Sequence, residues 1–153
     1  MKLYFLRHGK ADWPNWEKPD DARPLTKKGK KEMRCVAKLL CKLEVDSAVI
    51  LSSPLPRALE TAEIVAKCLG VPLQQERPLG KGFNAAKLRD ILKRNEVDEL
   101  MLVGHEPNFS AVIRAVTGGD VKLAKGGIAR IDIDEGQDAG RLIWLLSPKL
   151  AQT

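Results

Sequence analysis

The chain has 153 residues, 44% of them hydrophobic, which is enough for one domain with a buried core. It contains no run of about 18 apolar residues, so a membrane-spanning helix is excluded, and its apolar start is broken at Arg7, too early for a secretory signal. The net charge of +6 suits an anionic partner, but the lysines are scattered and no nucleic-acid-binding motif accompanies them. We therefore expect a single cytoplasmic domain over residues 1–153 that binds neither membrane nor nucleic acid.

Arg7, His8 and Gly9 directly follow an apolar run, residues 3–6, that predicts a short buried strand. The glycine lets the backbone turn sharply behind the two side chains. A guanidinium can hold the oxygens of a phosphoryl group while a neutral imidazole attacks its phosphorus. This order of residues predicts a phosphate site in which Arg7 binds the oxygens and His8 is the nucleophile.

Residues 10–24 come next and contain three prolines, Trp13, Trp16 and the acidic pair Asp20 and Asp21. Because proline lacks an amide hydrogen, we expect an irregular loop, and its place in the chain puts it at the rim of the site. The two tryptophans then either anchor the loop or contact a partner.

A helix is expected after Thr26, whose hydroxyl can cap the first turn. Apolar residues recur at helical spacing and would form its buried face: Met33, Val36, Ala37, Leu40 and Leu43. The lysines of residues 27–42 would form its solvated face.

A second segment, residues 45–51, is apolar after Asp46 and predicts a buried strand that ends at Ser52 and Ser53. Serine hydroxyls can be nucleophiles, but forming a turn and capping a helix are the simpler roles here. The helix that follows begins at Pro54 or Pro56, and Arg57 lies in its first turn.

The second half of the chain continues the alternation of strands and helices. The expected elements are a short strand over residues 71–76, a helix over 85–95, a buried strand over 100–103, a helix over 107–117, and a hairpin of 128–133 and 141–146 that turns through 135–140. The strand at 100–103 is followed by Gly104 and His105, much as the first strand is followed by His8 and Gly9.

This alternation predicts an α/β fold of three layers, α/β/α, with a mostly parallel sheet and an antiparallel strand from the C-terminal hairpin. Ligands of such sheets bind at the carboxyl ends of the strands. Three strand ends here carry Arg7 with His8, the two serines followed by Arg57, and His105, and the chain has no other histidine. We therefore expect these four side chains to meet at one edge of the sheet.

Metal and cysteine chemistry are poor alternatives for this site. The two histidines lie in neither an HxH nor an HExxH spacing, and they would share their pocket with two arginines, whose charges repel a cation. Cys35, Cys41 and Cys68 form no CxxC motif and lie in segments that look helical and apolar, so we expect buried, reduced thiols. We expect neither a metal nor another cofactor.

Four motifs resemble those of the histidine phosphatase superfamily, whose fold is also called phosphoglycerate mutase-like. They are LRHG at residues 6–9, RPLTKKG at 23–29, SPLPRALETA at 53–62 and VGHEP at 103–107. The short chain, the RPLT segment and VGHEP are similar to the SixA-type phosphohistidine phosphatases. The resemblance covers most of the chain and weakens after residue 117.

This resemblance implies a role for each residue of the expected site. His8 matches the nucleophile of the family, which carries the phosphoryl group as a phosphohistidine before passing it to water. Arg7, Arg57 and His105 match the groups that bind the phosphate oxygens.

The proton donor is where the sequence departs from the larger members, because residues 79–84 hold no carboxylate. Asp20 occupies the position at which the SixA-type pattern has an aspartate, so the resemblance points to Asp20, with Asp21 and Glu76 as alternatives. The other interpretation is that the two aspartates are turn residues beside a proline.

The length of the chain between residues 70 and 100 bears on the substrate. Relatives that act on small sugar or glycerate phosphates carry a sizeable helical insertion over the pocket, whereas only one short helix fits here. An open pocket suits a phosphorylated protein, so we expect a metal-independent phosphatase that releases inorganic phosphate from phosphohistidine in a phosphorelay protein. The alternatives are a small-molecule phosphomonoesterase of the same superfamily and a non-catalytic module that binds phosphate.

Overall fold

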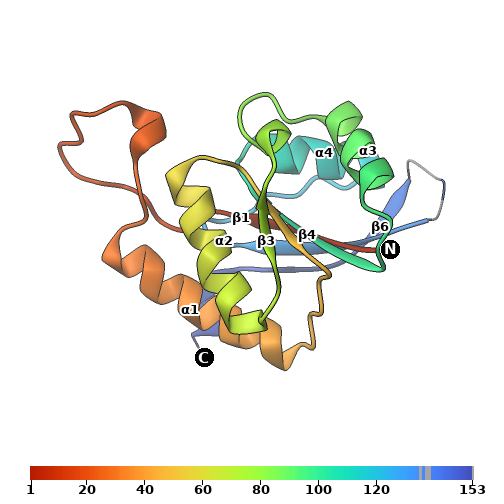
Figure 1. Ribbon diagram of the computed structural model, residues 1–153, viewed down its shortest axis with the longest axis horizontal. Coiled ribbons are helices and arrows are strands. Elements are labelled where there is room, and N and C mark those ends of the chain that lie inside the picture. Colours follow the sequence, from red (N-terminus) through yellow and green to blue (C-terminus); the bar gives the residue numbers. More distant parts are fainter. Residues whose placement is uncertain (135, 137–138, 153) are drawn as a thin grey trace.

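The computed structural model describes residues 1–134, 136 and 139–152. Over these residues, six strands form one sheet in the order β3-β2-β4-β1-β5-β6, with helices on both faces (Figure 1). The parallel strands are β1 (Lys2–Arg7), β2 (Ile50–Ser52), β3 (Leu73–Gln75) and β4 (Glu99–Gly104); β5 (Ile128–Ile133) runs antiparallel to both β1 and β6 (Gly140–Leu146). The expected three-layer α/β fold with a mostly parallel sheet is confirmed.

The helices divide between the two faces of the sheet. The elements are α1 (Lys27–Lys42), α2 (Pro56–Leu69) and α5 (Pro148–Ala151) on one face, α3 (Ala85–Arg94) and α4 (Asn108–Thr117) on the other, and two 3-10 turns, η1 (Asp20–Ala22) and η2 (Arg77–Leu79). Alternate residues of β1 serve the two cores: Tyr4 and Leu6 pack with α1 and α2, whereas Leu3 and Phe5 pack with α3 and α4. Each large side chain that is fully buried in this way contributes about 1.5 to 3 kcal/mol of transfer free energy.

Local signals fix where the helices on the α1 side begin and end. The Thr26 hydroxyl accepts a hydrogen bond from the Gly29 amide at 3.0 Å, as expected for the cap of α1. Pro56 opens α2, and Gly70, with φ of 68°, ends it in the left-handed region that favours glycine. Gly29 faces Lys10, and an added Cβ would collide with the Lys10 backbone, so α1 packs directly against the residue that follows Gly9.

Some expectations differ from the structure. The strand over residues 45–51 begins only at Ile50, and Leu43 follows the end of α1 with 45% of its surface exposed instead of lying on the buried face. The turn η1 and the short helix α5 were not expected. Part of the hairpin turn expected over residues 135–140 lies outside the described residues.

The expectation of buried thiols is wrong, because none of the three cysteines is fully buried. Cys41 and Cys68 are exposed, and Cys35 is half-buried; all three are free. The cysteines do lie in helices, but a helical segment has an outward face as well as an inward one, and Cys41 and Cys68 lie on the outward face.

None of the helices in the described residues is long and apolar enough to cross a membrane.

Candidate active site

Three neighbouring strands end at the same level and bring their next residues together. The parallel register pairs Arg7 of β1 with Gly104 of β4, and Ser52 of β2 with Val103 of β4. The His8 amide accordingly donates to the Gly104 carbonyl at 3.1 Å, and the Ser53 amide donates to the Val103 carbonyl at 2.9 Å. Residues 8, 53 and 105 therefore come one step beyond three adjacent strand ends, as the sequence predicts.

The His8 ring is buried and held in one tautomer. Its Nδ1 lies 2.7 Å from the Gly9 carbonyl oxygen, and because a carbonyl can only accept, Nδ1 carries the hydrogen. The lone pair of the neutral ring is then on Nε2. Burial lowers the pKa of His8 to about 3, helped by the positive charges of His105, Arg57 and Arg7, although the bond to Gly9 opposes the change. His8 is therefore neutral at physiological pH.

His105 lies beside His8. The two ring centroids are 5.3 Å apart, His105 Nε2 is 2.8 Å from the Ser53 hydroxyl, and Nδ1 is buried without a hydrogen-bond partner among the described residues. Burial lowers the pKa of His105 to about 4, with contributions from Arg57 and Arg7, while the Asp21 carboxylate opposes this. The second ring is thus also neutral before an anion arrives.

Arg57, which is buried, and Arg7, which is half-buried, bring two positive charges to these rings. Arg7 Nη1 donates to the Leu123 carbonyl at 2.9 Å, and Arg57 Nη1 donates to the Asp20 carbonyl at 3.3 Å. The Nε atom of each is buried without a partner, and neither guanidinium forms an ion pair within the described residues. Burial is the main cause that lowers the pKa of both arginines. Cations with buried, unused donors favour an anionic ligand, since a buried polar atom without a partner is costly.

The loop of residues 125–127 contacts the backbone around His8 and the first loop, residues 10–24. The Gly126 amide donates to the His8 carbonyl at 2.8 Å, and the Arg7 amide donates to the Gly127 carbonyl at 2.9 Å. Lys125, next to Gly126, reaches Asp12 of the first loop at 2.6 Å. The Lys125-Gly126-Gly127 segment thus holds the backbone of the first strand end in place.

The three carboxylates considered as proton donors are all paired with cations. Asp20 contacts Arg23 at 2.9 Å, Asp21 contacts Lys81 at 2.6 Å, and Glu76 contacts Arg94 at 2.9 Å. Asp20 touches the site through its backbone carbonyl, which accepts from Arg57. The Asp21 carboxylate acts electrostatically on both His105 and Arg57.

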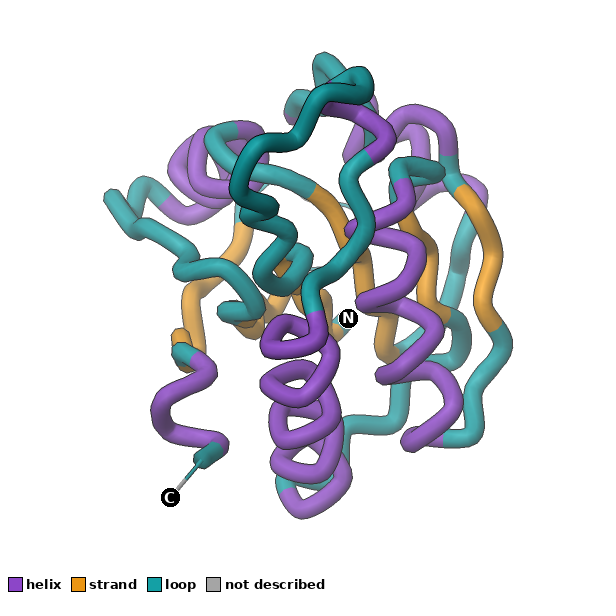
Figure 2. Tube along the Cα trace, turned by 90° about the vertical axis from the view of Figure 1, so that its left-hand side faces the viewer, coloured by secondary structure: helices purple, strands orange, loops and turns teal. Residues whose placement is uncertain are grey.

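The two tryptophans of the first loop use their indole N–H groups within the loop. Trp13 Nε1 donates to the Pro24 carbonyl at 2.8 Å, and Trp16 Nε1 donates to the Pro19 carbonyl at 3.0 Å. Their ring centroids are 6.2 Å apart, and 39% of the Trp13 surface is exposed. The loop projects from the body beside the first turn of α1 (Figures 1 and 2). The indoles therefore anchor the loop and still present surface to a partner.

Sequence reasoning missed three residues that hold the site together. Ser53 bonds His105, and its oxygen also accepts from the Leu55 amide, so the turn-forming role expected for it is only part of its function. The buried Thr61 hydroxyl accepts from the Gly9 amide at 3.0 Å and donates to the Arg57 carbonyl at 2.8 Å.

The third missed residue is Glu106, which acts on Arg7 through Leu123 and through its negative charge. Its carboxylate accepts from the amide and hydroxyl of Ser110 and from the Leu123 amide. Leu123 in turn offers its carbonyl to Arg7, and the negative charge of Glu106 raises the pKa of Arg7 against the effect of burial. The VGHEP motif carried this residue, but its pattern does not reveal the partners.

The fold and this cluster of side chains define the class of the protein. Residues 3–80 match the family model of the histidine phosphatase superfamily (branch 1), and the chain belongs to this superfamily. An uncharacterized protein of Picosynechococcus sp. is 36% identical to the chain, over 97% of the chain and 98% of that relative. Membership of this superfamily supports a phosphatase activity.

Within the superfamily, the chain is similar to SixA. The phosphohistidine phosphatase SixA of Escherichia coli is 28% identical, over 97% of this chain and 94% of SixA. The solved structure of the protein histidine phosphatase SixA complexed with tungstate matches with a TM-score of 0.86 and 26% identity, covering 98% of this chain and 99% of that one. The fold is accordingly phosphoglycerate mutase-like.

Proposed function

We propose that the protein is a phosphohistidine phosphatase that uses His8 as a covalent nucleophile, with residues 1–153 forming a single cytoplasmic catalytic domain. The observation that carries the proposal is the His8 ring itself, which is neutral, fixed by Gly9 and close to the charges of two guanidinium groups whose Nε atoms have no hydrogen-bond partner among the described residues. A nucleophile with a free lone pair beside buried cationic donors suits attack on a tetrahedral phosphoryl group. The tungstate bound by the similar SixA structure is a tetrahedral oxyanion of the same kind.

The reaction then has two steps, transfer of the phosphoryl group to His8 and its hydrolysis. His8 Nε2 attacks the phosphorus, a P–N bond forms, and the P–N bond to the substrate imidazole breaks as that imidazole takes up a proton. Water then attacks the phosphorus and gives a proton back to the group that protonated the leaving imidazole, the bond to Nε2 breaks, and inorganic phosphate leaves with His8 neutral again. Arg7, Arg57 and His105 hold the phosphate oxygens; each charge-assisted bond contributes about 1.5 to 3 kcal/mol, and losing one donor costs about 10² to 10³ in rate.

Asp20 is the proposed proton donor, with Asp21 and Glu76 as the alternatives. Asp20 is supported by its contact with Arg57, although this contact uses the backbone oxygen. Asp21 is supported by its electrostatic effect on His105. Replacing each of the three by Asn or Gln and comparing substrates with good and poor leaving groups separates them, because loss of the true donor harms the poor leaving group most.

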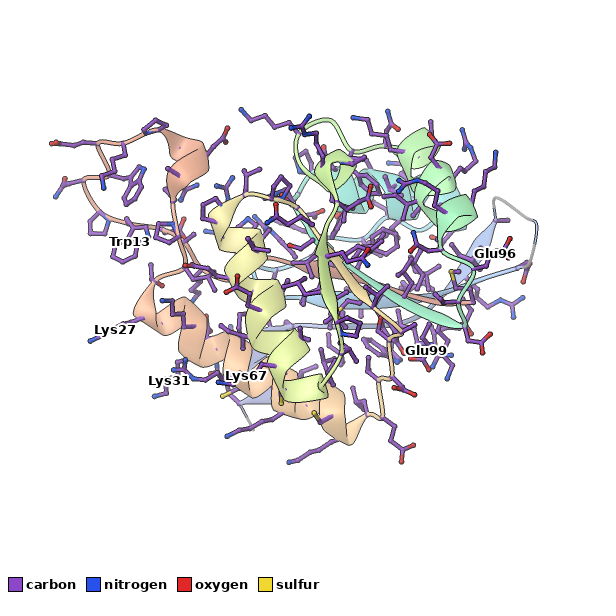
Figure 3. All side chains as sticks on the ribbon, in the orientation of Figure 1. Trp13, Lys27, Lys31, Lys67, Glu96 and Glu99 are labelled. Carbon is purple, nitrogen blue, oxygen red and sulfur yellow. The ribbon has the colours of Figure 1, made fainter. Side chains whose placement is uncertain are left out.

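A protein substrate is supported by the surface around the site. The segment between α2 and β4 holds only β3, η2 and the short α3, so no large helical cover is built there. The projecting loop presents Trp13, and α1 beside it presents seven exposed cations: Lys27, Lys28, Lys30, Lys31, Arg34, Lys38 and Lys42. In Figure 3, Lys27 and Lys31 extend outward from the first half of α1, and Trp13 lies above the start of this helix. Such a surface suits an acidic protein better than an enclosed metabolite.

The test is a substrate panel with the full chain and its His8→Ala variant. We expect turnover of a phosphohistidine-containing protein, weak turnover of 3-phosphoglycerate, unchanged rates with chelator, and an acid-labile, base-stable phosphoenzyme that is absent in His8→Ala. Preference for 3-phosphoglycerate would assign a phosphomonoesterase instead. Phosphate binding without turnover of any substrate would make the protein a binding module.

A further inference from the structure

Two exposed thiols lie close together at the ends of α1 and α2. Cys41 is in the last turn of α1 and Cys68 is in the last turn of α2, and the two helices pack directly against each other. The two Sγ atoms are 3.5 Å apart, and the Cys41 thiol also lies 3.6 Å from the Cys68 carbonyl oxygen, to which it can donate. The phosphatase chemistry uses neither residue.

We propose that Cys41 and Cys68 form a reversible disulfide that joins α1 to α2. A disulfide places its sulfur atoms about 2.0 Å apart, so the two must approach each other by about 1.5 Å. Both side chains are exposed, so side-chain rotation can bring the sulfurs together without displacing buried groups, and an oxidant in solution can reach them.

The reaction needs an oxidant, for which we assign a low-molecular-weight disulfide such as oxidised glutathione. One cysteine thiolate attacks it, a mixed disulfide forms and one glutathione thiolate leaves. The second cysteine thiolate then attacks the protein sulfur of the mixed disulfide, the bond between Cys41 and Cys68 forms, and the second glutathione leaves. The protein loses two protons and two electrons, and one oxidised glutathione becomes two reduced ones. The hydrogen bond to Cys68 raises the pKa of the Cys41 thiol, so the exchange is faster at alkaline pH.

The position of the pair determines what the bond does. Arg57 lies in the first turn of α2, and Cys68 lies about 16 Å further along the same helix. The bond therefore forms away from the phosphate-binding side chains and leaves them in place. It joins α1 to α2 and closes the loop of chain between residues 41 and 68. This cross-link restricts the conformations of the unfolded chain. The result is a redox-dependent gain in stability without loss of the site.

The experiment uses the full chain with Cys35→Ala, which leaves only the two thiols, together with the wild type. After incubation with oxidised glutathione, the intact mass should fall by two hydrogen atoms, and a non-reducing digest should contain the peptide that links Cys41 to Cys68. Tm should rise by about 5 to 10 °C and return to its former value with dithiothreitol.

The matched control is Cys41→Ser in the same background. This variant can only gain one glutathione, and its Tm should not rise. The proposal is overturned if both cysteines take up glutathione with no linked peptide, or if the linked protein melts no higher than the reduced one. Because mass and Tm do not depend on phosphate chemistry, the result stands whether or not the proposed phosphatase activity is found.

Discussion

His8 makes the stability of the fold depend on pH. The pKa of His8 is about 3 in the folded protein, because of burial and the charges of His105, Arg57 and Arg7, whereas an unfolded histidine titrates near 6.5. Between these values the unfolded chain binds the extra proton, so stability is greatest above pH 6.5 and is lost as the pH falls. We expect a loss of up to about 1.4 kcal/mol per pH unit from this residue.

Urea unfolding at several pH values between 7 and about 4 tests this dependence on His8. Carboxylates also titrate in this range, so the informative quantity is the difference between the wild type and His8→Asn. The variant should show a shallower dependence of unfolding free energy on pH. Equal slopes in the two proteins would contradict the assignment.

Thr61 connects two parts of the site through one hydroxyl. Replacing it by Val keeps the shape but leaves the buried Gly9 amide without a partner, which costs about 1 to 3 kcal/mol of stability. The strand end that carries His8 would then be less well held, and we expect kcat to fall. Thr61→Ser keeps the hydroxyl and should retain kcat, although it loses a buried methyl group. If both variants had the same kcat, the hydrogen bonds of Thr61 would not position the site.

For single residues of the site, the sequence predicted the arginines and histidines better than the hydroxyl side chains. Arg7, His8 and His105 could be found because each lies at or just beyond a strand end, a place that an apolar run reveals. Ser53 and Thr61 could not, because their partners are 52 residues away in the chain and a hydroxyl near a helix start has an ordinary capping role. Only the register of three strands brings such pairs together.

Among the elements, α1 depends on a single glycine for its position. Alanine is the better helix former by about 1 kcal/mol, so propensity alone favours Gly29→Ala. The added Cβ would meet the backbone of Lys10, which cannot rotate away as a side chain can, and overpacking of this kind costs about 1 to 3 kcal/mol. The clash outweighs the gain in helix propensity, so we expect a net loss of up to about 2 kcal/mol in the free energy of unfolding.

Lys30→Ala is the matched control for Gly29→Ala, because position 30 is exposed on the same helix. It should leave the unfolding midpoint in urea nearly unchanged. A stabilised Gly29→Ala protein would mean that α1 can move away from Lys10 at little cost. The displacement should also lower kcat, since Lys10 follows Gly9 directly.

The elements themselves were predictable where one residue type decided the outcome. Thr26, Pro56 and Gly70 mark helix ends, and the structure has ends at all three. The second strand was placed too early because Val45, Ala48 and Val49 are also apolar, yet the ladder with β4 begins only at Ile50. Periodicity could not place Cys41 and Cys68, since a small thiol fits either face of a helix and the packing of α1 on α2 decides which face is outward.

The whole molecule has an uneven distribution of charge around the candidate site. The acidic residue within α1, Glu32, is half-buried and contacts Lys10 at 3.6 Å, and none of the exposed cations of α1 forms an ion pair with a described residue. Free positive charges on one helix beside the site raise the local concentration of an acidic partner, and this attraction is screened by salt. Turnover of a protein substrate should therefore fall with ionic strength more steeply than turnover of phosphoramidate, a small substrate with the same P–N bond.

Charge reversal of Lys27 and Lys31 tests this docking surface directly. The double variant Lys27→Glu/Lys31→Glu should raise KM for an acidic phosphohistidine protein about fivefold to tenfold, because two attractive charges become repulsive. It should leave kcat/KM for phosphoramidate unchanged, since neither side chain belongs to the phosphate-binding cluster. Glutamate in the first turns of a helix also favours the helix dipole, so the fold should not suffer.

The matched control reverses two exposed cations with the same spacing on the opposite face of the sheet, Arg89→Glu/Lys93→Glu in α3. It changes the net charge of the molecule equally and should leave KM for the protein substrate nearly unchanged. Equal effects of the two double variants would show that net charge, and not the α1 surface, draws in the substrate. Loss of phosphoramidate turnover in the α1 variant would instead place Lys27 or Lys31 within the reach of the phosphoryl group, and α1 would then be part of the catalytic site and not a docking surface.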